Sequence, residues 1–186
     1  MRPEICGETP LASAKFLKLR EISFCDNKGK MRKWESADRV ADAKAVMIVP
    51  HISPDDEYLF IRQFRPPTGK MMIEFPAGLI DTGEMPEATA MRELYEETGY
   101  AGKLTELTNF GFSSPGMSGE PIAVAFVEID GNAYRDRVVT AHMEECESIE
   151  TFRVKRRDID GFIRRCEARG DGIDTKIYLF AAALQK

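Results

Sequence analysis

Apolar runs and alternating residues divide the chain into predicted strands, separated by residues that favour turns. In the N-terminal part, segments 14–25 and 31–40 are predicted strands, and the polar turn at 26–29 joins them into a hairpin. Runs rich in Val, Ile, Leu and Phe predict further strands downstream. These lie at residues 45–50, 58–64, 71–74, 107–112 and 122–129.

Three segments have helical character. A helix is predicted over residues 86–98, because Pro86 suits the first helical position and Gly99 suits its termination. A second helix is expected over 157–168, and residues 173–185 form either a third helix or a strand that leads into one. The mixture of strands and helices predicts an α/β protein.

The length and composition indicate a globular protein with a short extension. The 186 residues can bury a substantial core, and we expect an N-terminal β segment over 1–40 and one domain over 41–186. The mostly apolar stretch 41–50 is too short to span a bilayer, so a membrane role is not expected. The N-terminus lacks the apolar core of a signal peptide, and the four cysteines show no CxxC spacing. A cytoplasmic protein with free thiols is therefore expected.

Charge argues against nucleic acid as a partner. The formal net charge is −5, whereas nonspecific binding to phosphate backbones needs clustered Lys and Arg. The one dense basic run, Lys155-Arg156-Arg157, is more typical of a solvated helix start than of a nucleic-acid patch. We therefore expect no nucleic-acid partner.

The predicted helix over 86–98 carries an acidic edge. Glu93, Glu96 and Glu97 stand at i, i+3 and i+4, which places them within an arc of about 100°. Like charges at this spacing repel, so such a cluster needs either a cation or exposure to water. Taken alone, a glutamate-rich edge is more typical of a solvated surface.

The spacing around this edge changes that interpretation. The chain resembles the Nudix hydrolase family, because it fits the Nudix box GX5EX7REUXEEXGU at every fixed position; Tyr100 departs from the aliphatic residue preferred at the end of the box. The matching residues are Gly78, Glu84, Arg92, Glu93, Glu96, Glu97 and Gly99. The resemblance implies an α/β/α sandwich around a mixed β-sheet, with the N-terminal β-hairpin as an extension.

A metal-dependent cleavage of pyrophosphate follows from the resemblance. Hard cations such as Mg²⁺ take oxygen ligands, which carboxylates and carbonyls supply. The family pattern implies that Glu93, Glu96, Glu97 and the backbone carbonyl of Ala77 hold Mg²⁺, with Mn²⁺ as an alternative. It also implies catalytic roles for Glu93 and Glu97, whereas Arg92 orients the carboxylates.

Residues outside the box resemble the ADP-ribose pyrophosphatase branch. Segments 62–67 and 73–81 imply that Arg65 contacts the diphosphate and that Leu79 also contacts the substrate. Pro115 lies fifteen residues after Tyr100, a spacing that marks ADP-ribose enzymes in this family. Taken alone, Pro115 would more simply be a turn proline.

The N-terminal segment resembles the part of the eukaryotic-type enzymes that holds adenine in the partner subunit's site. Trp34 is expected to stack on the base, and Glu35 to accept a hydrogen bond from its amino group. Phe16 takes the place of a second tryptophan in the relatives, and Arg39 is a further phosphate contact. The resemblance implies a homodimer in which the 1–40 segment is exchanged.

The general base is expected outside the box. The acidic residues Glu144, Glu145, Glu147 and Glu150 compete for this role, and Glu147 aligns best. The expected reaction is Mg²⁺-dependent hydrolysis of ADP-ribose or another ADP-sugar to AMP and a sugar phosphate. A noncatalytic nucleotide sensor and a hydrolase of oxidised nucleoside diphosphates remain as alternatives.

Overall fold

The computed structural model describes residues 1–135, 138–141 and 148–185. Its residues form two compact units. The first unit combines Met1–Ala45 with Phe110–Ile122, and the second combines Val46–Asn109 with Ala123–Lys186.

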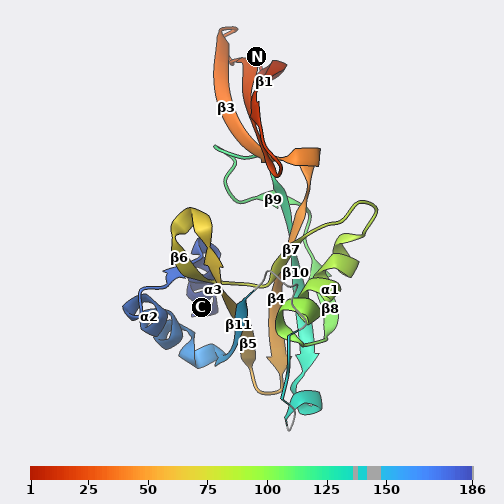
Figure 1. Ribbon diagram of the computed structural model, residues 1–186, viewed down its shortest axis with the longest axis vertical. Helices are drawn as coiled ribbons and strands as arrows, with labels where there is room; N and C mark the ends of the chain where they lie inside the picture. The colour runs from red at the N-terminus through yellow and green to blue at the C-terminus, as the bar shows by residue number, and fades with distance from the viewer. Residues whose placement is uncertain (136–137, 142–147, 186) are drawn as a thin grey trace. The chain divides into compact units, whose positions relative to one another are not determined.

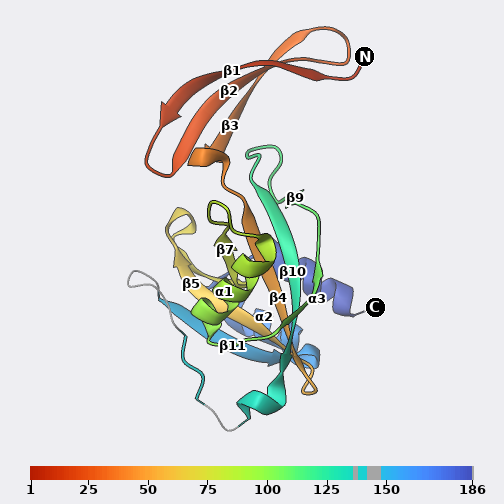
Figure 2. The ribbon, with the colours of Figure 1, turned by 90° about the vertical axis from the view of Figure 1, so that its right-hand side faces the viewer.

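The first unit contains a three-stranded antiparallel sheet in the order β1-β2-β3 (Figure 2). β2 (Leu17–Cys25) and β3 (Met31–Arg39) form the expected hairpin, and the carboxylate of Asp26 accepts hydrogen bonds from the backbone of the turn. β1 (Glu4–Ser13) was not predicted. Its ten residues are all exposed, so it has no buried face that would produce an apolar alternation.

The second unit is built on a mixed sheet with the order β12-β6-β5-β4-β10-β8. β11 also pairs with β5, and β7 pairs with β4. Most pairs are antiparallel, but β12 runs parallel to β6. The strands are β4 (Ala45–Ser53), β5 (Glu57–Arg65), β6 (Lys70–Glu74), β7 (Ala77–Leu79), β8 (Lys103–Leu107), β10 (Pro121–Asp130), β11 (Ile149–Lys155) and β12 (Gly172–Ile173).

The prediction of a single strand over residues 107–112 is wrong. The chain leaves β8 at Leu107 and forms a separate short strand, β9 (Gly111–Phe112), which pairs with the start of β10. The physical reason is that this segment passes from the second unit to the first between Asn109 and Phe110.

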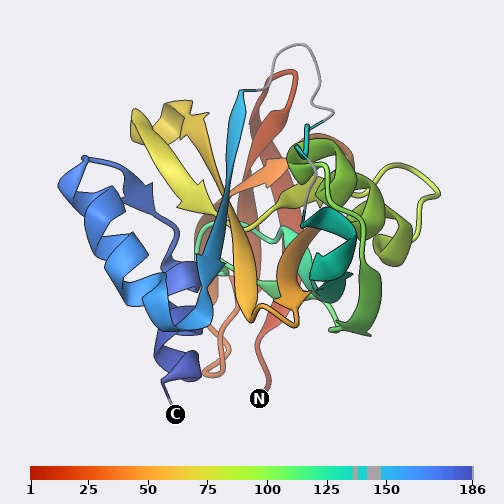
Figure 3. The same ribbon diagram turned by 90° about the horizontal axis from the view of Figure 1, so that it is seen from below.

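Helices cover both faces of the sheet in the second unit. α1 (Pro86–Thr98) lies on one face, whereas α2 (Ile159–Ala168) and α3 (Thr175–Leu184) lie on the other (Figure 3). This arrangement confirms the α/β/α sandwich. Short 3-10 turns occur at Val40–Asp42, Pro66–Thr68, Gly131–Tyr134 and Arg156–Asp158.

The observed bounds of α1 are those predicted from the sequence, whereas the bounds of the other two helices differ from the predicted ones. α2 begins at Ile159 rather than at residue 157, because residues Arg156–Asp158 form a 3-10 turn first. The C-terminal segment is the short strand β12 followed by α3, whose N-terminus is capped by the carboxylate of Asp174. Among the helices of the described ranges, none is long and apolar enough to cross a membrane.

The core on the α1 side is a cluster of aliphatic side chains from the sheet and the helix. Ala90 and Leu94 of α1 are fully buried against Val46, Leu59 and Val127 of the strands. Burial on this scale stabilises the unit by about 25 cal/mol for each Å² of apolar surface removed from water. The packing fixes the rotation of α1, and this rotation decides where its glutamates point.

Candidate active site

Local sequence defines both ends of α1. Pro86 occupies the first turn, where its missing N–H would have no helical acceptor, and Glu87 complements the positive end of the helix dipole. At the other end, Gly99 has φ 76° and its N–H donates to the carbonyl of Tyr95. A Cβ at Gly99 would lie 2.4 Å from the carbonyl oxygen of Thr140, so glycine is required there for space as well as for backbone conformation.

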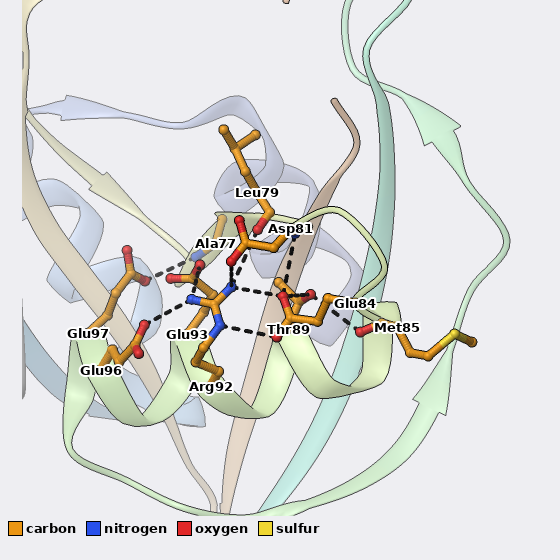
Figure 4. A network of polar contacts seen from close by, with 10 residues as sticks. All are labelled: Ala77, Leu79, Asp81, Glu84, Met85, Thr89, Arg92, Glu93, Glu96 and Glu97. Carbon is orange, nitrogen blue, oxygen red and sulfur yellow. Dashed lines mark hydrogen bonds and ion pairs between the residues drawn. The ribbon is translucent and has the colours of Figure 1, made fainter. Parts of the chain in front are cut away.

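Arg92 lies at the centre of the acidic edge (Figure 4). Its guanidinium donates to the carboxylates of Glu84 at 3.0 and 3.1 Å, Glu93 at 2.9 Å and Glu96 at 3.0 Å. One Nη also contacts the carbonyl of Leu79 at 3.5 Å. Arg92 therefore orients two glutamates of the edge and joins them to the loop before the helix.

Glu84 has a different environment from the other box glutamates. Hydrogen bonds from Arg92, and then from the hydroxyl of Thr89, lower the pKa of the Glu84 carboxyl to about 2. Glu84 in turn is the largest cause of the raised pKa of Arg92. Both groups are thus ionised at neutral pH, and Glu84 serves as the anchor of the arginine.

Glu97 connects α1 to β7. Glu97 is only 4% exposed, and its carboxylate accepts a hydrogen bond from the backbone N–H of Ala77 at 3.1 Å (Figure 4). The neighbouring Gly78 has no room for a side chain, because a Cβ there would lie 1.9 Å from Oε1 of Glu93. The glycine of the box thus lets the Glu93 carboxylate lie against the backbone of β7.

The donor atoms of this region suit a hard divalent cation. Carboxylates of Glu93, Glu96 and Glu97 and the backbone of Ala77 offer oxygen ligands without sulfur or imidazole. Within the described ranges, no three Asp, Glu, His or Cys side chains are already gathered in a way that would hold a metal ion.

Arg65 lies on the same face of the sheet as α1. Thr151 of β11 contacts the carbonyl of Glu97 at 3.4 Å and pairs with Ile61, so the Ile61 side of β5 faces α1. Side chains alternate along a strand, which places Arg65 on this side as well. Its guanidinium is held at 2.8 Å by Glu74 and remains 44% exposed.

The structure separates the candidates for the general base. Glu147, Glu144 and Glu145 lie outside the described residues. Glu150 is adjacent to Thr151 in β11, so its side chain points to the opposite face, where it accepts a hydrogen bond from Arg62 at 3.3 Å. Its position on the α2 side of the sheet argues against Glu150 as the base.

Arg62 belongs to a partly buried network that sequence reasoning missed. It donates at 3.0 and 3.1 Å to Asp171, which also binds Arg169 at 2.6 Å. Burial opposes ionisation of Asp171, but hydrogen bonds from the two arginines outweigh it and lower the pKa of the carboxyl. This network attaches the end of α2 to β5.

In the first unit, Trp34 and the loop after β9 form a second group of candidate residues. The indole is exposed, and its N–H donates to the carbonyl of Gly116 at 2.9 Å, next to Pro115. Asp38 holds the same loop, because its buried carboxylate accepts hydrogen bonds from the Gly119 N–H at 2.7 Å and from Arg20 at 2.8 Å. Asp38 was not predicted, since a lone acidic residue in a strand gives no signal of such a role.

The remaining N-terminal candidates are spread along the sheet. Trp34 pairs with Ile22, which is six residues from Phe16, or roughly 20 Å along an extended strand. Phe16 is 67% exposed in the turn between β1 and β2, and Glu35 is exposed on β3. Arg39 forms an ion pair with Glu120. One chain therefore does not bring Phe16 and Trp34 face to face.

Comparisons with known proteins agree with this geometry. Residues 42–161 match the NUDIX domain. An ADP-sugar pyrophosphatase of Mus musculus is 31% identical over 97% of this chain and 87% of its own length. An ADP-ribose pyrophosphatase of Saccharomyces cerevisiae is 32% identical over 89% of this chain and 75% of its own. The crystal structure of an ADP compounds hydrolase shares the fold, with a TM-score of 0.67 and 23% identity over 88% of this chain and 84% of that one.

Proposed function

The chain belongs to the Nudix family, and on this premise we propose that it hydrolyses the pyrophosphate of ADP-ribose or another ADP-sugar, which releases AMP and a sugar phosphate. The observation that carries the proposal is the arrangement of the box around Arg92. It holds Glu93 and Glu96 beside β7, while Glu97 binds the N–H of Ala77. The relatives that share the sequence over most of this chain are named for this chemistry.

Mg²⁺ is the cofactor that we propose, with Mn²⁺ as a substitute. Glu93, Glu96, Glu97 and the carbonyl of Ala77 would hold it, and all of these ligands are oxygens. When bound, the cation neutralises charge on the diphosphate and lowers the pKa of bound water. Arg92 keeps Glu93 and Glu96 on one side of α1, and Glu84 keeps Arg92 in place.

In the reaction that we propose, a water oxygen attacks one phosphorus and the bond to the bridging oxygen breaks. The bridging oxygen leaves with the other phosphate, so AMP and the sugar phosphate each end as monoesters. Glu147 would accept the proton of the water. Arg65, on the α1 face, would contact the diphosphate, and Leu79 would contact the substrate beside it.

The adenine site that we propose needs two copies of the chain. Trp34 would stack on the base and Glu35 would bind its amino group, while Phe16 from the other copy would cover the second side of the ring. Arg39 would add a contact to phosphate. The separation of Phe16 and Trp34 along one sheet supports this arrangement.

A homodimer with an exchanged 1–40 segment also accounts for the surface of the first unit. β1 is exposed along its whole length, and large apolar side chains such as Ile5, Leu17 and Met31 are more than half exposed. Monomeric proteins seldom expose apolar groups in this density. We further infer a cytoplasmic location from the free thiols of Cys6, Cys25 and Cys166. The proposed partner is a small-molecule nucleotide-sugar, and the net charge of −5 argues against nucleic acid.

The test is AMP release from ADP-ribose, ADP-glucose and ADP-mannose in Mg²⁺ or Mn²⁺. Glu97→Gln should lower turnover on every substrate, because it removes one charged ligand. The matched control is Glu87→Gln, which makes the same change on the exposed first turn of α1. Wild-type turnover in Glu97→Gln would contradict the site.

Two other outcomes would contradict the activity itself. Tight binding of ADP-ribose without AMP release in saturating Mg²⁺ would indicate a nucleotide sensor. Faster hydrolysis of an oxidised nucleoside diphosphate than of any ADP-sugar would indicate a different substrate class.

A further inference from the structure

A pocket of about 510 Å³ lies along β11 and α2 in the second unit. Its size falls within the range of about 300–1,000 Å³ that is usual for small-molecule sites. The lining includes Phe152 and Val154 of β11 and Phe162 of α2, which lie on the face of the sheet opposite α1. Figures 1 and 3 show α2 on this side, away from the glutamate helix. We call it the β11–α2 pocket.

The floor of the β11–α2 pocket is aromatic and apolar. The rings of Phe152 and Phe162 lie with their centroids 5.2 Å apart, and Cys166 and Val154 are buried beside them. The guanidinium of Arg169 lies 5.9 Å from the centre of the Phe152 ring. Phe152 is half-buried, so part of its ring is available to a flat group that enters the pocket.

The rim of the pocket is positively charged, with four cations and two carboxylates in its lining. Arg153 forms an ion pair with Glu57 at 2.6 Å, and Arg169 forms one with Asp171 at 2.6 Å. Lys155 and Arg165 differ, because neither forms an ion pair with any residue of the described ranges. Strand alternation places Lys155 on the face of Thr151 and Arg153, which is the α1 face, so Arg165 of α2 is the cation that this pocket offers to an anion from outside.

We propose that the β11–α2 pocket is a second binding site, separate from the glutamate site, for a small aromatic anion of the nucleoside monophosphate class. Arg165 would bind its phosphate, since a guanidinium is a usual protein partner of this group. The base would lie on Phe152, beside the guanidinium of Arg169.

The test uses a fluorescent reporter inside the pocket. Trp34 is the one tryptophan of the chain, so Trp34→Phe combined with Phe152→Trp leaves a single indole, located on the pocket floor. AMP is titrated without divalent metal, and the emission of this indole should change and saturate. Circular dichroism during thermal unfolding checks that the reporter protein folds. Absence of a saturable change in a folded reporter would overturn the proposal.

Two adjacent arginines of α2 provide a matched pair of variants. Arg165 lines the pocket, whereas Arg164, which is exposed and carries the same charge, does not. In the reporter background, Arg165→Glu should weaken AMP binding by about tenfold or more, because a charged contact is replaced by repulsion. Arg164→Glu should leave the affinity close to that of the reporter. Equal weakening by both substitutions would show a general charge effect and would overturn the site.

Fragments of the ligand test separately the contact of the phosphate with Arg165 and the contact of the base with the aromatic floor. Inorganic phosphate and adenosine should each bind more weakly than AMP, because each meets either Arg165 or the aromatic floor alone. Equal affinity for inorganic phosphate and AMP would contradict the role of Phe152. If the reporter does not fold, calorimetry of AMP binding to Arg165→Glu and Arg164→Glu in the otherwise unchanged chain makes the same comparison. None of these measurements depends on hydrolysis, so failure here is distinguishable from failure of the proposed activity.

Discussion

Arg92 donates hydrogen bonds to both carboxylate oxygens of Glu84, from Nε at 3.1 Å and from Nη2 at 3.0 Å. This two-point contact fixes the plane of the guanidinium, and its remaining Nη1 reaches Glu93 and Glu96. Glu84 therefore acts on the acidic edge through the arginine. This two-point contact explains why the box specifies Glu84 and Arg92 at a fixed separation.

The Glu84 ion pair predicts a pH dependence of stability. The folded-state pKa of Glu84 is about 2, below the ordinary value of 4.5, so its stabilising effect is present above pH 4.5 and is lost as pH falls toward 2. We expect Glu84→Gln to unfold at a lower urea concentration than wild type at pH 6, and the difference to shrink as the pH is lowered through this window. Glu87→Gln is the control and should keep the wild-type pH profile. A Glu84→Gln difference that is constant down to pH 2 would contradict the ion pair.

Gly78→Ala tests the close contact between β7 and Glu93. The added Cβ would lie 1.9 Å from the carboxylate, so Glu93 must move from its place beside the backbone. We expect activity, and affinity for Mg²⁺, to fall by about 10- to 100-fold, as for other changes that displace a ligand of a metal site. The Mg²⁺ dependence of AMP release measures this loss. Gly111→Ala, whose Cβ would meet its neighbour at an ordinary 3.9 Å, should retain the wild-type dependence.

Asp38→Ala tests whether the loop at 113–120 positions Trp34. The change leaves the Gly119 N–H without its acceptor and removes one of the two carboxylates that bind Arg20, which keeps its ion pair with Glu8, and it should cost about 1–3 kcal/mol of stability. If Trp34 holds the substrate, KM for ADP-ribose should rise more than kcat falls, and the emission of this single tryptophan should shift. A loss of stability with unchanged KM and emission would show that Asp38 has a purely structural role.

Paired substitutions distinguish the candidates for the base. Glu147→Gln should lower kcat by about 10²- to 10⁴-fold, the usual contribution of a general base. Glu150→Gln should leave kcat near wild type, because Glu150 faces Arg62 on the other side of the sheet. A large loss of kcat in Glu150→Gln with little effect in Glu147→Gln would reverse the assignment. The pH dependence of kcat gives a second readout.

α1 shows what could be predicted from the sequence. Its bounds follow from Pro86 and Gly99, and the spacing of Glu93, Glu96 and Glu97 follows from the helical repeat. All of these depend on interactions between residues that are close in the chain. The family, and with it the fold of the second unit, was also predictable, because the box specifies its residues at fixed separations.

Other elements depend on contacts between distant residues and could not be predicted. β1 lacks an apolar alternation because no face of it is buried, and β7 has three residues, too few to show a period. β11 contains an alternation of Phe152 and Val154, but it is interrupted by charged residues that face the other way.

The orientation of single side chains was decided by tertiary structure alone. Sequence placed Glu150 among four candidates, of which Glu147 aligned best, and only the pairing of β11 with β5 shows that Glu150 points to Arg62. The pairing of Asp38 with Gly119 likewise joins residues 81 positions apart. Local sequence determined the helix and the order of its carboxylates, because backbone preferences act over a few residues. The folded sheet determined which groups meet these carboxylates, because the face that a strand residue occupies depends on its pairing with distant strands.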